Sequence, residues 1–175
     1  MDFLAHIWYT CFYKTSVISG DTMLDIYTVS LFGHREISYD PELETKLEQT
    51  FVRLLQTHSY VSFLVGREGE FDLFAAGIIH RIRENWGDHN SELVWVMPYL
   101  KQEYVNNADA YDNFYSHVEV CEESDSAHFK AAIGIRNRHM IDRSDLVIAY
   151  LRHHTGGVAK AVGYAKQQYI PVLEL

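Results

Sequence analysis

The chain has 175 residues, a formal net charge of −9 at pH 7, and apolar and charged fractions typical of a globular protein. No stretch is apolar for long enough to cross a membrane as a helix, so we expect no membrane partner. The two cysteines, Cys11 and Cys121, are too few for a disulfide framework and indicate free thiols in a reducing, cytoplasmic setting.

The charge is unevenly distributed. Residues 127–175 contain seven Lys or Arg and three Asp or Glu, a net charge of +4, so the rest of the chain carries −13. An acidic body disfavours broad contact with a nucleic-acid backbone, which usually requires a basic face. The local basic segment therefore favours a small anionic ligand and makes nucleic acid an unlikely partner, although solvated helix faces would also explain these charges.

Residues 1–22 differ from the rest of the chain. They are rich in aromatic side chains and contain one Lys or Arg, Lys14, in an order that does not match a signal peptide. The regular pattern begins after Met23. We interpret residues 1–22 as an N-terminal extension, with Met23 as a candidate native start, and residues 23–175 as a single domain.

Strand-like and helix-like segments alternate after residue 23. The former are short apolar runs stopped by glycine, proline or polar residues, and the latter repeat apolar residues every three to four positions. In chain order the pattern predicts a strand at Ile26–Phe32, a helix at 41–58 with Asp40 as N-cap and Pro41 in the first turn, a strand at 61–65, a helix at 71–84, a strand at 93–97, a helix at 127–143, a strand at 146–150, a helix at 157–168 and a strand at 170–173. The polar, tyrosine-rich segment 99–126 is expected to be a long connection with a short helix near 109–115 and a candidate strand at 117–120.

Short, wholly apolar strands alternating with helices are typical of a parallel sheet covered on both faces. We therefore predict an α/β, Rossmann-like, doubly wound and mainly parallel sheet of about five strands with helices on both faces. In such sheets ligands bind beyond the carboxyl ends of the strands, near the point where the strand order reverses. Four segments of this chain follow strand ends and carry residues suited to a ligand.

The first segment follows the strand Ile26–Phe32. Gly33 permits a tight turn or a close ligand approach, His34 can donate a hydrogen bond, and Arg35 can pair with a phosphate. Taken alone, this trio is better explained as an ordinary strand-ending turn with solvated side chains.

The second and third segments carry weaker signals. Gly66 and Gly69 form a GxxG loop before a helix with Asp72 in its first turn, where a carboxylate caps the helix or accepts a hydrogen bond from a ribose hydroxyl. The spacing is not the dinucleotide-binding fingerprint. Pro98 and Gln102 follow the third strand, and they are candidates for a pocket wall that stacks on a base.

The fourth segment combines a glycine pair with two arginines. Gly156 and Gly157 follow a buried strand and open a helix, so their N–H groups and the helix dipole suit a phosphate or another anion. Arg136 and Arg138 supply positive charge from the preceding helix. Residues two apart diverge on a regular helix, so both face one ligand only if the helix ends or bends there; otherwise one binds and the other lies at the surface.

Other chemistries lack their signatures. None of the ten histidines shows HxxxH or zinc-finger spacing, and no GxSxG nucleophile elbow is present. We therefore expect no metal, no cofactor and no nucleophilic hydrolase.

The joint order of these motifs resembles the SLOG superfamily of Rossmann-like proteins, in particular its small bacterial and phage branch. The resemblance runs from about Ile26 to Leu173, and rests on GHR after the first strand, GxxGxxD overlapping FDLFAAG, MPY with Gln102, and RNRHMIDRSDLVIAY before TGGVAKAVGYAK. The superfamily contains the LOG cytokinin-activating phosphoribohydrolases and the DNA-processing protein A family. The resemblance implies a nucleotide or nucleotide-derived ligand at the strand ends and homo-oligomers, often dimers.

Only part of the LOG motif is present. Arg136 stands at the place of the LOG arginine, Met140 also matches, and Gly156–Gly157 match the glycine pair of PGGxGTxxE, but Gly163 replaces its glutamate. N-glycosidic cleavage passes through a cationic sugar that a carboxylate stabilises, which Gly163 cannot do. Asp72 can take the place of this missing glutamate only if the fold brings it close to the rest of the motif.

The expected function is therefore binding or sensing of a nucleotide or nucleotide-derived ligand without strong catalysis. The alternative is an enzyme, a phosphoribohydrolase or a nucleoside deoxyribosyltransferase-like N-glycosidase, for which Arg136 and Asp72 would be the catalytic candidates. A DNA-handling role like that of the DNA-processing branch is disfavoured by the acidic body of the chain.

Overall fold

The computed structural model describes residues 18–19, 22–23, 25–87 and 89–175. Most of the predicted N-terminal extension, residues 1–22, lies outside this range. The described part near its end contains two short strands, β1 (Ile18–Ser19) and β2 (Thr22–Met23), which pair in antiparallel fashion.

Strands and helices alternate along the rest of the described chain. In order they are β3 (Ile26–Phe32), α1 (Pro41–Thr57), β4 (Tyr60–Val65), α2 (Glu70–Trp86), β5 (Ser91–Met97), α3 (Gln102–Asn106), α4 (Ala108–Phe114), β6 (His117–Val120), α5 (Glu122–Asp125), α6 (Phe129–Asp142), β7 (Leu146–Ala149), α7 (Gly156–Gln167) and β8 (Val172–Glu174). In the part of the chain that the structure describes, no helix combines the length and apolarity needed to cross a membrane.

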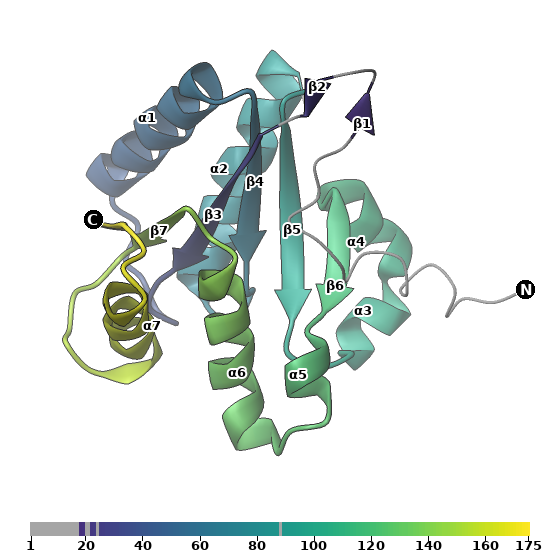
Figure 1. Cartoon of the computed structure of the whole chain (residues 1–175), viewed down its shortest axis with the longest axis vertical. Helices are drawn as coiled ribbons and strands as arrows, with labels where there is room; N and C mark the ends of the chain where they lie inside the picture. Colours follow the sequence, from purple (N-terminus) through teal and green to yellow (C-terminus); the bar gives the residue numbers. More distant parts are fainter. Residues whose placement is uncertain (1–17, 20–21, 24, 88) are drawn as a thin grey trace, which may run out of the picture.

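Six of the strands form one parallel sheet in the order β6-β5-β4-β3-β7-β8 (Figure 1). The predicted Rossmann-like α/β architecture is confirmed, with six strands in place of about five because the candidate strand at 117–120 joins the sheet as β6. The chain steps outward from β3 to β6 and then returns to the other side of β3 as β7. The strand order therefore reverses between β3 and β7, where such folds bind ligands.

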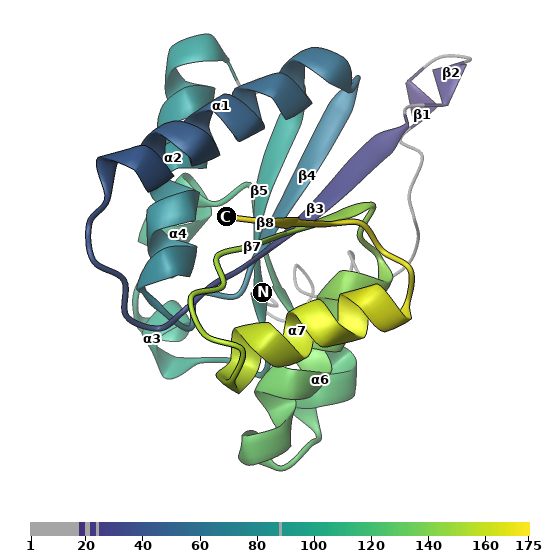
Figure 2. The same cartoon turned by 90° about the vertical axis from the view of Figure 1, so that its left-hand side faces the viewer.

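Helices cover both faces of the sheet, as Figure 2 shows, with α1, α2 and α4 on one side and α6 and α7 on the other. Successive strand residues point to opposite faces. Leu31 belongs to the core under α1 and α2, whereas the adjacent Phe32 belongs to the core under α6 and α7. Burial on both faces explains why the strands read as continuous apolar runs.

The start of α1 follows the sequence prediction. Pro41 is the first helical residue, and the Asp40 carboxylate accepts a hydrogen bond from the Glu42 N–H at 2.9 Å, as an N-cap should.

The segment 99–126 is more ordered than predicted. It contains α3 and α5 in addition to the expected α4 and β6. These two helices were not predicted, because helices of four or five residues have no readable apolar period. The tyrosines of this segment pack on the buried Trp95 of β5: the ring centroids of Tyr104, Tyr111 and Tyr115 lie 5.9, 5.0 and 5.6 Å from it. Aromatic packing therefore holds the segment against the edge of the sheet.

Two of the loop glycines are required by close packing within the chain. A Cβ on Gly33 would lie 2.1–2.5 Å from atoms of the buried Phe71 side chain, and one on Gly69 would lie 2.5 Å from the Arg35 Cα. The loops after β3 and β4 are further joined where the Glu70 N–H donates to the Arg35 carbonyl at 2.8 Å. Packing within the chain is therefore enough to explain both glycines, without the close ligand approach that the sequence suggested for Gly33.

We expect Gly33→Ala to destabilise the fold by about 1–3 kcal/mol, because the new methyl group overlaps a ring that the core holds in place. Gly77→Ala is the matched control, since a Cβ there meets nothing within 4 Å and alanine favours the interior of α2. Urea unfolding of both variants measures the difference, and equal stabilities would contradict the packing argument.

Candidate functional site

A cavity of about 410 Å³ lies at the switch point, between the loops after β3 and β4, the α6 helix and the start of α7. Nine of the residues expected to bind a ligand line it: Gly33, His34, Arg35, Gly66, Gly69, Asp72, Arg136, Gly156 and Gly157. They come from four separate segments that the sheet topology brings to one edge. We refer to this cavity as the switch-point pocket.

Arg136 is held beneath the pocket by the face of α6 that packs on the sheet. Ala132, Arg136 and Met140 recur at four-residue intervals, which places them on one stripe of the helix, and all three are buried. Arg136 is only 1% exposed, and its Nη1 donates a hydrogen bond to the Val96 carbonyl of β5 at 2.8 Å. A cation therefore occupies a position that the helix pattern would otherwise give to an apolar residue.

Gly66 makes room for this guanidinium. A Cβ on Gly66 would lie 2.1 Å from Arg136 Nη1 and 2.6 Å from the guanidinium carbon. Burial lowers the pKa of Arg136, while Glu68, with an oxygen 3.8 Å from Nη2, and Asp72 act in the opposite direction. Arg136 Nε is buried without a hydrogen-bond partner in the described structure. The pocket is thus lined by a desolvated cation with an unused donor.

Arg138 does not share this position. Because α6 runs unbroken to Asp142, residues two apart diverge, and Arg138 is exposed and does not line the pocket. The sequence left open whether one or both arginines face the ligand, and in the structure Arg136 alone of the two lines the pocket. The adjacent Asn137, which the sequence analysis did not select, lines the pocket instead.

The start of α7 faces the pocket with an open backbone. Gly156 and Gly157 are the first two helical residues, and the side chain of the N-cap residue Thr155 makes no capping hydrogen bond. The first N–H groups of a helix have no partner within it, and the dipole makes this end positive. A Cβ on either glycine would meet nothing within 4 Å, in contrast to Gly66. Gly156 has φ +89°, which favours glycine.

Asp72 is a buried carboxylate at the start of α2. Its Oδ2 accepts a hydrogen bond from the Glu68 N–H at 3.0 Å, so the side chain ties the loop before α2 to the first turn of that helix. Burial raises the pKa of Asp72 to about 6, although that hydrogen bond and the charge of Arg136 oppose the increase. The group therefore takes up a proton slightly below neutral pH.

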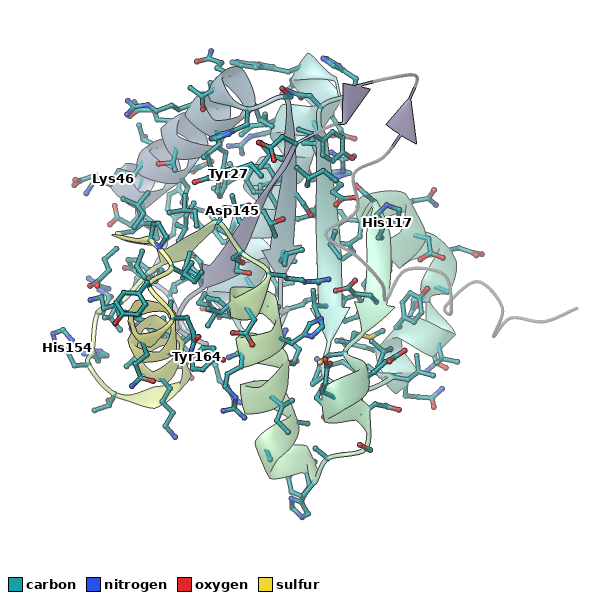
Figure 3. All side chains as sticks on the ribbon, in the orientation of Figure 1. Tyr27, Lys46, His117, Asp145, His154 and Tyr164 are labelled. Atoms are coloured by element: carbon teal, nitrogen blue, oxygen red, sulfur yellow. The ribbon has the colours of Figure 1, made fainter. Side chains whose placement is uncertain are left out.

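His34 joins the loops on the two sides of the switch point. Its Nε2 accepts a hydrogen bond from the Arg152 N–H at 2.9 Å, which requires that Nε2 carry no proton. Burial lowers the pKa of His34, and nearby His153 and Arg152 add to the effect. His34 is thus a neutral acceptor toward the β7–α7 loop, and its Nδ1 carries the proton available for donation. Figure 3 shows His154 projecting outward from the same loop.

A second hollow of about 670 Å³ adjoins the first and shares His34 and Arg35 with it. Arg152 and His153 extend its wall on one side, and Glu36 and Glu70 are also among its lining residues. The two hollows together form a continuous recessed surface that runs past the switch-point pocket.

Pro98 and Gln102 lie outside the pocket. Pro98 is buried, and its carbonyl accepts a hydrogen bond from Ser124 Oγ at 2.6 Å. Gln102 is exposed and donates to Asn106 Oδ1 at 2.9 Å. The expected base-stacking wall after β5 is therefore not part of the cavity, although Lys101 of the same segment reaches Glu68 at 2.6 Å.

Five lining residues were not predicted from the sequence: Phe32, Glu68, Ile133, Asn137 and Val158. Two signals were present. Glu68 lies inside the GxxG loop, and Ile133 and Asn137 are one helical turn apart beside Arg136. By contrast, Arg67 of the same loop points elsewhere, with its guanidinium 5.0 Å from the centre of the Trp95 ring.

The fold and the position of the pocket define a doubly wound α/β protein with a switch-point site. Two solved structures of DNA processing protein A share this fold. The *Helicobacter pylori* protein, described for its single-stranded DNA binding mode, matches with a TM-score of 0.59 and 16% identity over 85% of this chain and 64% of its own. The *Streptococcus pneumoniae* protein matches with a TM-score of 0.58 and 15% identity over 85% of this chain and 50% of its own.

This chain spans less than two thirds of either protein, and at this level of identity the likeness establishes the fold. No family model and no curated protein matches the sequence. The resemblance to the SLOG superfamily, which contains the DNA-processing protein A family, is thus confirmed in the fold.

One expectation is corrected by this comparison. The acidic body of the chain was taken to make nucleic acid an unlikely partner, yet the *H. pylori* protein with this fold binds single-stranded DNA. The inference was wrong because it used the charge of the whole chain, whereas a narrow groove that holds a single strand requires positive potential only along its own wall.

The raised pKa of Asp72 predicts a pH-dependent stability. The folded state binds the proton more tightly than the unfolded chain, so stability rises as the pH falls from 7 toward 5. Relative to Asp72→Asn, which cannot titrate, the wild type should gain about 1 kcal/mol over this interval. Urea unfolding at several pH values measures the difference, and parallel pH profiles for the two proteins would show that Asp72 does not titrate there.

Proposed function

We propose that the chain binds a nucleotide or nucleotide-derived ligand in the switch-point pocket, without strong catalysis. The observation that carries this proposal is that the open N-terminus of α7 and the buried guanidinium-bearing residue Arg136 line one cavity. Both features favour an anion, the first through backbone N–H groups and the second through a desolvated charge. A cytoplasmic setting and the homodimer implied by the family resemblance form part of the same proposal.

The pocket suggests how such a ligand is oriented. A phosphate fits at Gly156 and Gly157, where no side chain intervenes. Asp72 is ionised at neutral pH and would repel a phosphate, but it accepts hydrogen bonds from sugar hydroxyls or from the donor groups of a base. The ligand therefore lies with its phosphate toward α7 and its sugar toward α2.

Single-stranded nucleic acid is the second candidate, and the adjoining hollow favours it. His34 and Arg35 connect the two hollows, and Arg152 and His153 supply further donors along the same path. A ligand with several phosphates would use this surface, whereas a mononucleotide would fill only the switch-point pocket. The H. pylori protein, which shares this fold and binds single-stranded DNA, supports this second candidate.

The enzyme alternative gains one feature from the structure. Asp72 lines the same cavity as Arg136, which meets the condition for it to replace the carboxylate missing at Gly163. Its hydrogen bond to the loop before α2 also accounts for its position, and for that reason binding without catalysis remains the proposal.

A thermal-shift screen tests ligand binding. We expect one or more of a set comprising nucleoside monophosphates, cyclic nucleotides and ADP-ribose to raise the Tm by about 5–10 °C when present at 100 times its Kd. Gly157→Val should abolish this shift without lowering the Tm of the free protein, because the added side chain enters open space at the anion-binding N–H groups. Gly163→Ala, in the same helix but outside the pocket, should retain it.

The outcomes separate the candidates. Stabilisation by an oligodeoxynucleotide alone would replace the mononucleotide with single-stranded DNA as the ligand. No stabilisation by any of these compounds at millimolar concentration, or an unchanged shift in Gly157→Val, would remove the proposal.

The catalytic alternative has its own test. Incubation of the protein with nucleoside monophosphates should release no free base, as measured by chromatography. Release of base that is lost in Asp72→Asn and retained in Gly163→Ala would instead establish N-glycosidic cleavage, with Asp72 supplying the carboxylate.

A further inference from the structure

Three side chains with metal-binding atoms meet on the far side of α6 from the start of α7. Cys121 follows β6, Glu123 lies in α5, and His139 lies on α6. Their ligand atoms all lie within 4.8 Å of one another. The α5 and α6 helices run side by side at this place (Figure 1), so segments 16 residues apart contribute to one cluster.

The contacts within the cluster are close to those of a metal site. Cys121 Sγ lies 3.2 Å from Glu123 Oε2, and His139 Nδ1 lies 3.1 Å from the same oxygen. Around a tetrahedral zinc ion the ligand atoms are about 3.3–3.6 Å apart, given bond lengths of about 2.0 Å to nitrogen or oxygen and 2.3 Å to sulfur. The third pair, Cys121 Sγ and His139 Nδ1, lies within 4.8 Å, so coordination requires these two atoms to close around the ion while their distances to Glu123 change little.

The surrounding structure fixes the three ligands in place. Cys121 is 1% exposed, and its N–H donates to the Met97 carbonyl at 2.8 Å, which ties it to the end of β5. Ser124, one residue after Glu123, is also buried and donates to the Pro98 carbonyl. His139 lies next to the buried Met140 on α6. The ligands thus come from segments that the core already positions, and little ordering is required on binding.

The chemistry of the set selects a class of ion. Thiolate and imidazole ligands favour zinc and other divalent transition metals, whereas magnesium and calcium prefer oxygen alone. A divalent cation bound by one thiolate and one carboxylate forms a neutral unit, which suits a half-buried location. The Glu123 side chain is 61% exposed, so water can reach a fourth position.

We propose that Cys121, Glu123 and His139 form a binding site for a divalent transition metal of the zinc class, with water as the fourth ligand. On binding, the Cys121 thiol gives its proton to solvent and a metal–sulfur bond forms. The His139 proton on Nδ1, which faces the Glu123 carboxylate in the metal-free protein, leaves to solvent while Nε2 takes up a proton from solvent, so that Nδ1 and the Glu123 carboxylate each donate an electron pair to the metal. No change of oxidation state is involved. The sequence showed no zinc motif because the ligands lie on three elements and lack the usual spacing.

Titration of the reduced protein with Co²⁺ tests the site. We expect a near-ultraviolet thiolate-to-cobalt absorption band that saturates at one equivalent, is accompanied by proton release, and is removed by Zn²⁺. Cys11→Ser should keep the band and Cys121→Ser should lose it, which assigns the sulfur. E123Q and His139→Ala, at positions more exposed than Cys121, should weaken Co²⁺ binding at least about tenfold.

His128→Ala is the matched control, because it removes a histidine near the start of α6 that is not in the cluster. Far-ultraviolet circular dichroism establishes that each variant is folded. The absence of a band with excess Co²⁺, or unchanged affinity in both E123Q and His139→Ala, would overturn the proposal and leave a hydrogen-bonded cluster only.

Discussion

The buried guanidinium of Arg136 is the constraint on which the pocket depends. It occupies an inward position of α6, it is paired with the Val96 carbonyl, and it requires a glycine at position 66. Burying a charge here costs desolvation free energy, which is partly offset by the carboxylates of Glu68, in the loop before α2, and Asp72, in its first turn. The carboxylates of the pocket therefore stabilise the charge of Arg136, while its Nε–H has no hydrogen-bond partner in the described structure.

Much of the fold could be predicted because its strands are buried on both faces and its helices are long. The apolar run Ile26–Phe32 and the cap at Asp40 leave little choice of structure, and the order of elements then implies a parallel sheet. The short helices α3 and α5 could not be predicted, since they have no apolar period of their own and pack on Trp95 and Pro98, which lie outside these helices.

The sequence predicted which segments form the candidate site better than it predicted what each residue does there. Glycines and charges after strand ends pointed to the correct edge of the sheet. The sequence could not show that Gly33 and Gly69 accommodate neighbouring chain atoms, or that Gly156 and Gly157 face open space, because each distinction depends on what packs opposite. It also could not place Pro98 and Gln102, whose loop turns toward α5 and α3 and away from the pocket.

The unbroken course of α6 has a mechanical consequence. Arg136 and His139 are three residues apart, with an offset of about 4.5 Å along the helix axis, so one turn of α6 contributes to both the switch-point pocket and the Cys121 cluster. Any displacement of this stretch of α6 therefore moves both residues together. If ligand binding in the pocket displaces α6 and changes the metal affinity of the cluster, metal binding must change the ligand affinity by the same factor.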